Sequence, residues 1–279
     1  MASVEYLTRP EPGRRFRAAL FDFDGTVSLI RQGWQDVMIP YFTEVLSDTP
    51  EGRQSREEDL YACAREFVDR LTGKQTIFQC MALDEAVVAR GGPARDPMAY
   101  KNEYLRQLMQ RIDSRLSALR SGSADPEDYL VRGASDFLRG LCEMEMPIFL
   151  ASGTDQPAVR EEARLLGVDR FFGDRIFGAR DEDATACSKE LVIRRILTEQ
   201  GLSGRDLLSF GDGFVEIELV ANIGGYPVAV ATDEARRQGV NPAKRERLIA
   251  AGAAAVVPDF GPTKELLSLV RNGGKERAL

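Results

Sequence analysis

The stretch AALFDFDGT, residues 18–26, restricts the fold of this chain more than any other feature. A run of apolar residues ends abruptly at two aspartates, Asp22 and Asp24, and a Gly-Thr pair follows them. The run predicts a short buried strand, and along an extended chain residues i and i+2 point to the same side. Both carboxylates can therefore address one ligand from the end of the strand. The alternative reading is an ordinary Asp-Gly turn with no chemistry attached.

The remainder of the chain shows two different patterns. Residues 28–125 have mostly helical spacing, with helices expected over 33–46, 56–71, 77–89 and 96–120. From residue 126 onward the pattern alternates. Helices are expected at 135–144, 156–166 and 189–200, and short apolar strands at 147–151, 175–177, 207–210, 228–231 and 254–257. Such alternation indicates a mainly parallel sheet with helices on both faces.

We therefore expect an α/β fold with two parts. Residues 1–30 and 126–279 would form a Rossmann-like, doubly wound, mainly parallel sheet core, and residues 31–125 an inserted α-helical cap domain. In open parallel sheets the ligand site lies beyond the carboxyl ends of the strands. An insertion directly after the first strand would sit above that crevice, where it would hinder protein substrates and admit small ones.

Composition excludes several mechanisms. The chain has 279 residues, a net charge of −7 and no histidine. Ser-His-Asp and Cys-His nucleophile systems and His-ligated zinc are therefore excluded within this chain, and acid/base work falls to carboxylates, Lys, Tyr or Cys. The cysteines at positions 63, 80, 142 and 187 form no CxxC pair and are expected to be reduced thiols.

Several classes of partner are also disfavoured. No basic stripe interleaved with aromatic residues is present, so nucleic acid is not expected as a partner. No apolar run approaches the ~20 residues of a membrane span. The first 17 residues are polar and lack the apolar middle of a signal peptide. We expect a cytoplasmic protein that is a monomer or homodimer.

Three further segments place polar side chains at a strand end or a helix start. Asp212 follows the strand expected at 207–210, with Glu216 four residues later. Ser152, with Gly153 and Thr154, follows the strand expected at 147–151. Its hydroxyl and the nearby amides could bind a phosphoryl oxygen, although a helix N-cap is the simpler reading of the isolated segment.

The chemistry of these side chains suits transfer of a phosphoryl group. Asp22 could attack phosphorus to give an aspartyl-phosphate, and Asp24 could protonate the leaving oxygen and later activate water. Lys189, which begins an expected helix, could neutralise the phosphoryl group. Because neighbouring carboxylates repel one another, a cation is expected between them, and Mg²⁺ prefers oxygen ligands.

In this order, the four segments closely resemble the haloacid dehalogenase superfamily of phosphotransferases, over most of the chain. The resemblance implies Asp22 as nucleophile, Asp24 as general acid/base, Ser152 as phosphate ligand and Lys189 as charge stabiliser. It also implies a Mg²⁺ site that comprises Asp22, Asp212 and the Asp24 backbone carbonyl, supported by Glu216 or by Glu218. Members that dehalogenate lack the second aspartate, so Asp24 favours hydrolysis of phosphate esters.

The inserted helices resemble the helical cap of that family. In such caps a turn between two helices often reaches the substrate, and residues 71–76 (LTGKQT) match it best. Lys74 and Gln75 would then read the leaving group; a plain helix C-cap is the equal alternative. Arg31 lies where the family has a flap and could contact an anionic substrate. Thr26, Gly153 and Thr154 complete the expected substrate-binding set.

The expected activity is that of a magnesium-dependent phosphomonoesterase, with a sugar or polyol phosphate as the first guess for the substrate. One alternative is a phosphosugar mutase of the same fold, but mutases of the family use a cap histidine that this chain lacks. The other is a catalytically idle member that binds a phosphometabolite or a protein. The intact set of acids and Lys189 argues against an idle site.

Overall fold

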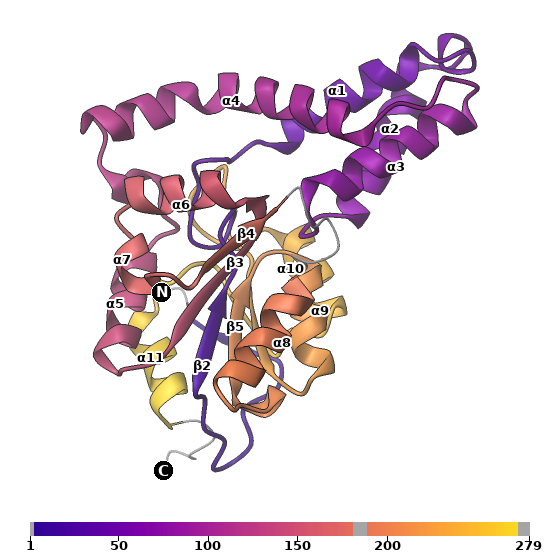
Figure 1. Ribbon diagram of the computed structural model, residues 1–279. Helices are drawn as coiled ribbons and strands as arrows, with labels where there is room; N and C mark the ends of the chain where they lie inside the picture. Colours follow the sequence, from indigo (N-terminus) through magenta and orange to yellow (C-terminus); the bar gives the residue numbers. More distant parts are fainter. Residues whose placement is uncertain (1–2, 181–188, 273–279) are drawn as a thin grey trace. The chain divides into compact units, whose positions relative to one another are not determined.

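The computed structural model describes residues 3–180 and 189–272, and a single sheet organises them (Figure 1). In spatial order its seven strands are β1-β7-β6-β5-β2-β3-β4. Their bounds are β1 Glu5–Tyr6, β2 Ala18–Phe21, β3 Ile148–Asp155, β4 Ile176–Ala179, β5 Leu207–Gly211, β6 Tyr226–Val230 and β7 Ala255–Val257. All neighbouring strands are parallel except β1, which pairs antiparallel with β7.

Helices cover both faces of this sheet. Figure 1 shows α5, α7 and α11 on one side and α8 and α9 on the other. The helices in the chain after residue 126 are α5 Ala134–Glu143, α6 Gln156–Leu165, α7 Asp169–Phe172, α8 Lys189–Glu199, α9 Phe214–Asn222, α10 Pro242–Ala250 and α11 Thr263–Asn272. The predicted doubly wound, mainly parallel α/β core is confirmed.

Strand β2 is buried on both faces because its side chains alternate between two cores. Ala18 and Leu20 pack with residues of α8 and β3, such as Val192 and Phe149. Phe21 points the other way into an aromatic cluster that includes Phe137, Phe172, Phe210 and Phe260. Burial on both sides removes water from the strand and fixes the position of the residue that follows it, Asp22.

A helical insertion lies between β2 and β3, as predicted. It contains α1 Gln35–Ser47, α2 Glu57–Arg70, α3 Thr76–Ala89 and α4 Pro97–Ser121. The chain divides into two compact units, residues 33–115 and residues 1–32 with 116–279, so that α4 crosses the division. The domain boundaries expected from the sequence, after residues 30 and 125, stay a prediction.

Several elements escaped the sequence reasoning. Strand β1 has only two residues, and α7, α9, α10 and α11 have no counterpart among the helices expected from the sequence. Strand β3 is longer than expected, because it continues to Asp155 with a shift of register against β4 after Ala151. In the described part of the chain no helix is long and apolar enough to cross a membrane. Cys63, Cys80 and Cys142 are free thiols, and Cys187 lies outside the described residues.

Candidate active site

The sheet order brings the motif-bearing strands together. Strand β2 lies between β5 and β3, to both of which it is parallel. The carboxyl ends of these three strands therefore meet at one edge, where the direction of winding changes. Asp22 follows β2, Asp212 follows β5, and Ser152 lies in the last part of β3. Segments that are far apart in the chain thus meet at one edge of the sheet.

The turn after β2 depends on Gly25. Its φ of +77° lies in the left-handed region, which costs a residue with a side chain about 1–2 kcal/mol. Space is equally restrictive, because a Cβ at this position would come within 2.3 Å of Asp212 Oδ2. Glycine therefore permits both the turn and the close approach of the neighbouring loop.

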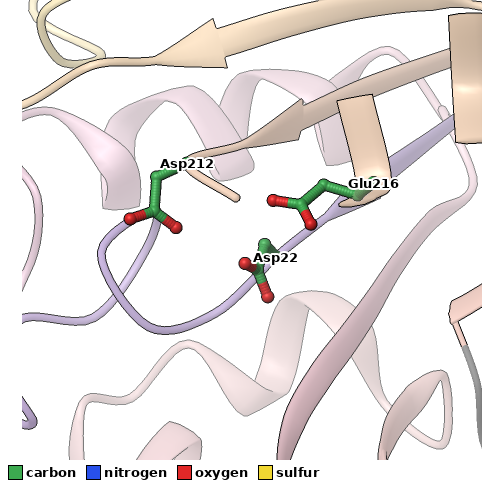
Figure 2. A group of neighbouring side chains, drawn as sticks. All are labelled: Asp22, Asp212 and Glu216. Carbon is green, nitrogen blue, oxygen red and sulfur yellow. The ribbon is translucent and has the colours of Figure 1, made fainter. Parts of the chain in front are cut away.

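Three carboxylates converge beside this turn. Asp22, Asp212 and Glu216 each offer one oxygen, and these oxygens lie within 4.8 Å of one another (Figure 2). Glu216 lies in the first turn of helix α9, and its Oε1 accepts a hydrogen bond of 2.6 Å from the Gly213 N–H. Glu216 is buried, whereas Glu218 on the same helix is exposed. Of these two acids only Glu216 belongs to the group.

Lys189 supplies the positive charge of this group. Its ammonium lies 3.0 Å from Asp22 Oδ1 and 2.8 Å from Glu216 Oε2, and all three side chains are at least 92% buried. Burial alone would lower the pKa of Lys189, but Asp22 and Glu216 outweigh it and raise that pKa, so the ammonium stays charged. The residues just before it, 181–188, lie outside the described residues.

The surroundings of Asp22 disfavour the ionised form of its carboxylate. Burial raises the pKa of Asp22 well above its usual range, and although Lys189 opposes the shift, Glu216 and Asp212 add to it. Its Oδ1 accepts a hydrogen bond of 2.8 Å from the Phe23 N–H. Among the described residues no hydrogen bond reaches Asp22 Oδ2. That oxygen remains available to a cation or to phosphorus.

Asp24 is held by hydroxyl groups from β3. Its Oδ2 accepts a hydrogen bond of 2.7 Å from Thr154 Oγ1 and a long one of 3.4 Å from Ser152 Oγ. The other oxygen, Oδ1, is buried and has no hydrogen-bond partner in the described chain. Ser152 Oγ also accepts a hydrogen bond from the Thr154 N–H, so that Gly153 lies in a tight turn of the strand. The irregular end of β3 thus aims two hydroxyls at one carboxylate.

These acids suit a divalent cation. Lys189 pairs with Asp22 and Glu216, Lys244 pairs with Asp212 and Glu234, and Arg31 pairs with Glu162 and lies 3.9 Å from Asp24. These six acids face three cations, so part of their negative charge is uncompensated. The donors are all carboxylate oxygens, which Mg²⁺ prefers, and among the described residues the buried Asp24 Oδ1 has no hydrogen-bond partner. The residues present therefore fit a magnesium ion.

Comparison with known families agrees with this geometry. The sequence model described as haloacid dehalogenase-like hydrolase matches residues 16–224, which include every residue of the carboxylate group. The chain belongs to the haloacid dehalogenase-like hydrolase family. A search of curated proteins finds no match.

Solved structures share the fold of this hydrolase at low sequence identity. A predicted phosphoglycolate phosphatase from Haemophilus somnus has a TM-score of 0.59 at 14% identity, covering 90% of this chain and 97% of its own. A predicted phosphatase from Clostridium acetobutylicum has a TM-score of 0.59 at 16% identity, with 91% and 100% covered. A family hydrolase from Deinococcus radiodurans with bound phosphate and sodium has a TM-score of 0.55 at 16% identity, with 94% and 100% covered.

Arg31 of the hydrolase has a different environment from the one expected. Its guanidinium is buried and donates to Glu162 on α6, at 2.7 Å from Nη2 and 3.0 Å from Nε to Oε1. It also lies 3.9 Å from Asp24 Oδ1. The geometry therefore shows Arg31 in a buried ion pair beside the site. Contact with a substrate stays a prediction.

Two charged residues beside the carboxylate group, Lys244 and Glu234, were not predicted as site residues from the sequence. Lys244, from the first turn of α10, lies 2.8 Å from Asp212 Oδ2 and 2.7 Å from Glu234 Oε1. Burial alone would lower the pKa of Lys244, but Asp212 and Glu234 raise it, and the ammonium stays charged. Lys244 stands in a charged run that reads as a solvated helix face, so no local signal distinguishes it.

The remaining predicted site residues belong to different units of the chain, Thr26 to residues 1–32 with 116–279, and Lys74 and Gln75 to residues 33–115. Thr26 is buried, and its Oγ1 lies 3.4 Å from Asp212 Oδ1. Lys74 and Gln75 belong to the helical unit, in the loop between α2 and α3, where Gly73 has a φ of +91°. The buried Nε2 of Gln75 has no hydrogen-bond partner among the described residues.

Proposed function

We propose that this chain is a magnesium-dependent phosphomonoesterase that hydrolyses a small phosphorylated metabolite through an aspartyl-phosphate on Asp22. The observation that carries the proposal is the arrangement around Asp22. One of its oxygens is fixed by Lys189 and the Phe23 N–H, while no described hydrogen bond reaches the other. A carboxylate held in this way keeps one oxygen oriented for attack on phosphorus.

The first step would form a bond between Asp22 and phosphorus and break the bond to the ester oxygen. The leaving oxygen takes a proton, which Asp24, two residues away on the same turn, would donate. Thr154 Oγ1, at 2.7 Å, fixes the orientation of the Asp24 carboxyl. In the second step water attacks phosphorus, Asp24 takes the proton of that water, and Asp22 is released with inorganic phosphate.

Positive charge must balance the phosphoryl group during both steps. The buried Lys189 ammonium is fixed between Asp22 and Glu216 and would neutralise part of that charge. Asp22, Asp212 and the Asp24 backbone carbonyl would hold Mg²⁺, with Glu216 in support. When bound, the cation supplies the charge that offsets these acids and polarises the phosphoryl group.

The leaving group would be read by the helical insertion. Gln75 offers a buried amide nitrogen that has no hydrogen-bond partner in the described chain, and Lys74 in the same loop carries a positive charge. Sugar or polyol phosphates stay the first guess for the substrate. The predicted phosphatases from Haemophilus somnus and Clostridium acetobutylicum and the phosphate bound to the Deinococcus radiodurans protein support the reaction class.

The test is release of inorganic phosphate from a panel of sugar, polyol, nucleotide and acid phosphates, with and without Mg²⁺. We expect magnesium-dependent release by the wild type and a loss of at least about 1,000-fold in kcat for Asp22→Asn, because the nucleophile is removed. Glu218→Gln, an exposed acid on α9, is the matched control and should keep wild-type activity. Full activity of Asp22→Asn would refute the mechanism, and isomerisation without phosphate release would indicate a mutase.

A further inference from the structure

Lys244 has a fixed position beside the three carboxylates of Asp22, Asp212 and Glu216. The Asn241 side chain caps helix α10 by accepting a hydrogen bond of 3.0 Å from the Lys244 N–H, which fixes the first turn. The Lys244 side chain is 10% exposed and reaches Asp212 and Glu234. Glu234 lies in the loop between β6 and α10 and is 22% exposed. The ammonium therefore bridges two acids in a largely buried position.

The two oxygens of Asp212 are consequently not equivalent. Oδ2 accepts a hydrogen bond of 2.8 Å from the Lys244 ammonium. It is also closed from the side of the turn after β2, because the Gly25 backbone leaves no room for even a Cβ there. Among the described residues Oδ1 accepts a single hydrogen bond, a long one of 3.4 Å from Thr26 Oγ1. One oxygen of Asp212 is thus engaged by a fixed positive charge, and the other is nearly free.

The other two acids of the group are also engaged by buried donors, Glu216 at both oxygens and Asp22 at one. Glu216 accepts at Oε1 from the Gly213 N–H, at 2.6 Å, and at Oε2 from Lys189, at 2.8 Å. Asp22 accepts at Oδ1 from both the Phe23 N–H and Lys189, at 2.8 and 3.0 Å. Each carboxylate therefore has at least one oxygen occupied by a buried donor. None of the three can offer both oxygens to a cation without losing one of these bonds.

We propose that Lys244, held by Glu234, limits Asp212 to a single oxygen for a cation and thereby makes the site select Mg²⁺ over Ca²⁺. Ca²⁺ takes six to eight oxygen ligands and accepts carboxylates through both oxygens, whereas Mg²⁺ binds one or two carboxylates in an octahedral shell and keeps several waters. A site of single oxygens therefore favours Mg²⁺. This inference rests on the proposed cation site but concerns ion selectivity and not turnover.

The test measures ion binding to the full-length protein without any substrate. Thermal denaturation at increasing MgCl₂ or CaCl₂, at constant ionic strength, gives a dissociation constant for each ion from the stabilisation it produces. For the wild type we expect a lower constant for Mg²⁺ than for Ca²⁺. In Lys244→Met, Asp212 Oδ2 becomes available, and the preference for Mg²⁺ should fall by about tenfold or more.

Two further variants make the experiment decisive. Lys244→Met leaves Glu234 buried without its partner, so the double variant Lys244→Met/Glu234→Gln removes both charges and should show the same loss of preference. Arg245→Met removes a charge from the same helix, where Arg245 is 35% exposed and pairs with Glu5, and should keep the wild-type preference.

The outcomes separate this inference from the proposed function. A wild type that binds Ca²⁺ at least as tightly as Mg²⁺, or a double variant with the wild-type preference, overturns the role of Lys244 even if the protein is a phosphatase. A wild type that neither ion stabilises overturns the cation site itself. Phosphate release that depends on Asp22, together with an unchanged preference, leaves the proposed function standing and this inference refuted.

Discussion

The ion pair between Arg31 and Glu162 allows a test of how burial determines the contribution of an ion pair to the free energy of unfolding. Glu162 on α6 is 4% exposed and Arg31 is 8% exposed. The adjacent residue, Glu161, forms an ion pair of the same length, 2.7 Å, with Arg120. In that pair the side chains of Glu161 and Arg120 are 44% and 45% exposed. Two neighbouring glutamates of one helix thus differ mainly in burial.

The expected magnitudes follow from this difference. Breaking a buried pair leaves an uncompensated charge and costs about 3–5 kcal/mol, whereas an exposed pair contributes about 0–1 kcal/mol. We expect Glu162→Gln to lose about 3 kcal/mol of unfolding free energy, at the low end of this range. The glutamine oxygen can still accept one hydrogen bond from Arg31, and Asp24, 3.9 Å from Arg31, still offsets part of its charge. Glu161→Gln should lose less than about 1 kcal/mol.

Replacing the whole pair should cost less than breaking it. Burial raises the pKa of Glu162 even though Arg31 opposes the shift, so placing this carboxylate in the interior is itself unfavourable. The double variant Arg31→Met/Glu162→Leu removes both charges and fills similar volume. It should therefore be more stable than Glu162→Gln alone.

Urea denaturation of the four proteins at pH 7.5, followed by tryptophan fluorescence and circular dichroism, measures these differences. Equal losses for Glu161→Gln and Glu162→Gln would show that burial does not set the cost and would refute the reasoning. A double variant less stable than Glu162→Gln would show that the pair is a net source of stability. Phosphatase assays of the double variant also test the predicted contact of Arg31 with substrate, since that contact requires a raised KM.

Two other predictions concern the turn after β2 and a buried thiol. Gly25→Ala should lose at least about 1–2 kcal/mol of stability and its magnesium-dependent activity, because the φ of +77° is unfavourable and the new Cβ displaces Asp212; denaturation and phosphate-release assays measure both. Burial raises the pKa of Cys80 to about 12, so above pH 9 the unfolded chain releases this proton while the folded chain retains it. Stability should therefore fall, by up to about 1.4 kcal/mol per pH unit, and less steeply in Cys80→Ala. Equal slopes in urea titrations at pH 8–11 would contradict this.

Much of the fold could be read from the sequence because its patterns are local. The apolar run before Asp22 could be buried only as a strand between two layers, and the alternation after residue 126 requires crossover helices. The four helices of the insertion also had clear helical spacing. Shorter elements were missed. Strand β1 has two residues and owes its existence to pairing with β7, which no local pattern encodes.

The site was predictable to the extent that its residues stand in compact motifs. Asp22 and Asp24 stand at the end of one strand, and Asp212 and Glu216 follow another, so a shared edge brings them together. The choice between Glu216 and Glu218 depended on the direction of α9. Only the structure decides it, because the Gly213 N–H and Lys189 hold Glu216 inward while Glu218 faces solvent.

The sequence by itself determined the α/β class, the place of the insertion and the two aspartates that define the candidate chemistry. The tertiary structure decided which charges surround them. Arg31 meets Glu162, which is 131 residues away, and Lys244 meets Asp212, 32 residues away. Whether such pairs form depends on distances across the sheet, and the energy of each pair depends on its burial. The local sequence pattern contains neither the distances nor the burial.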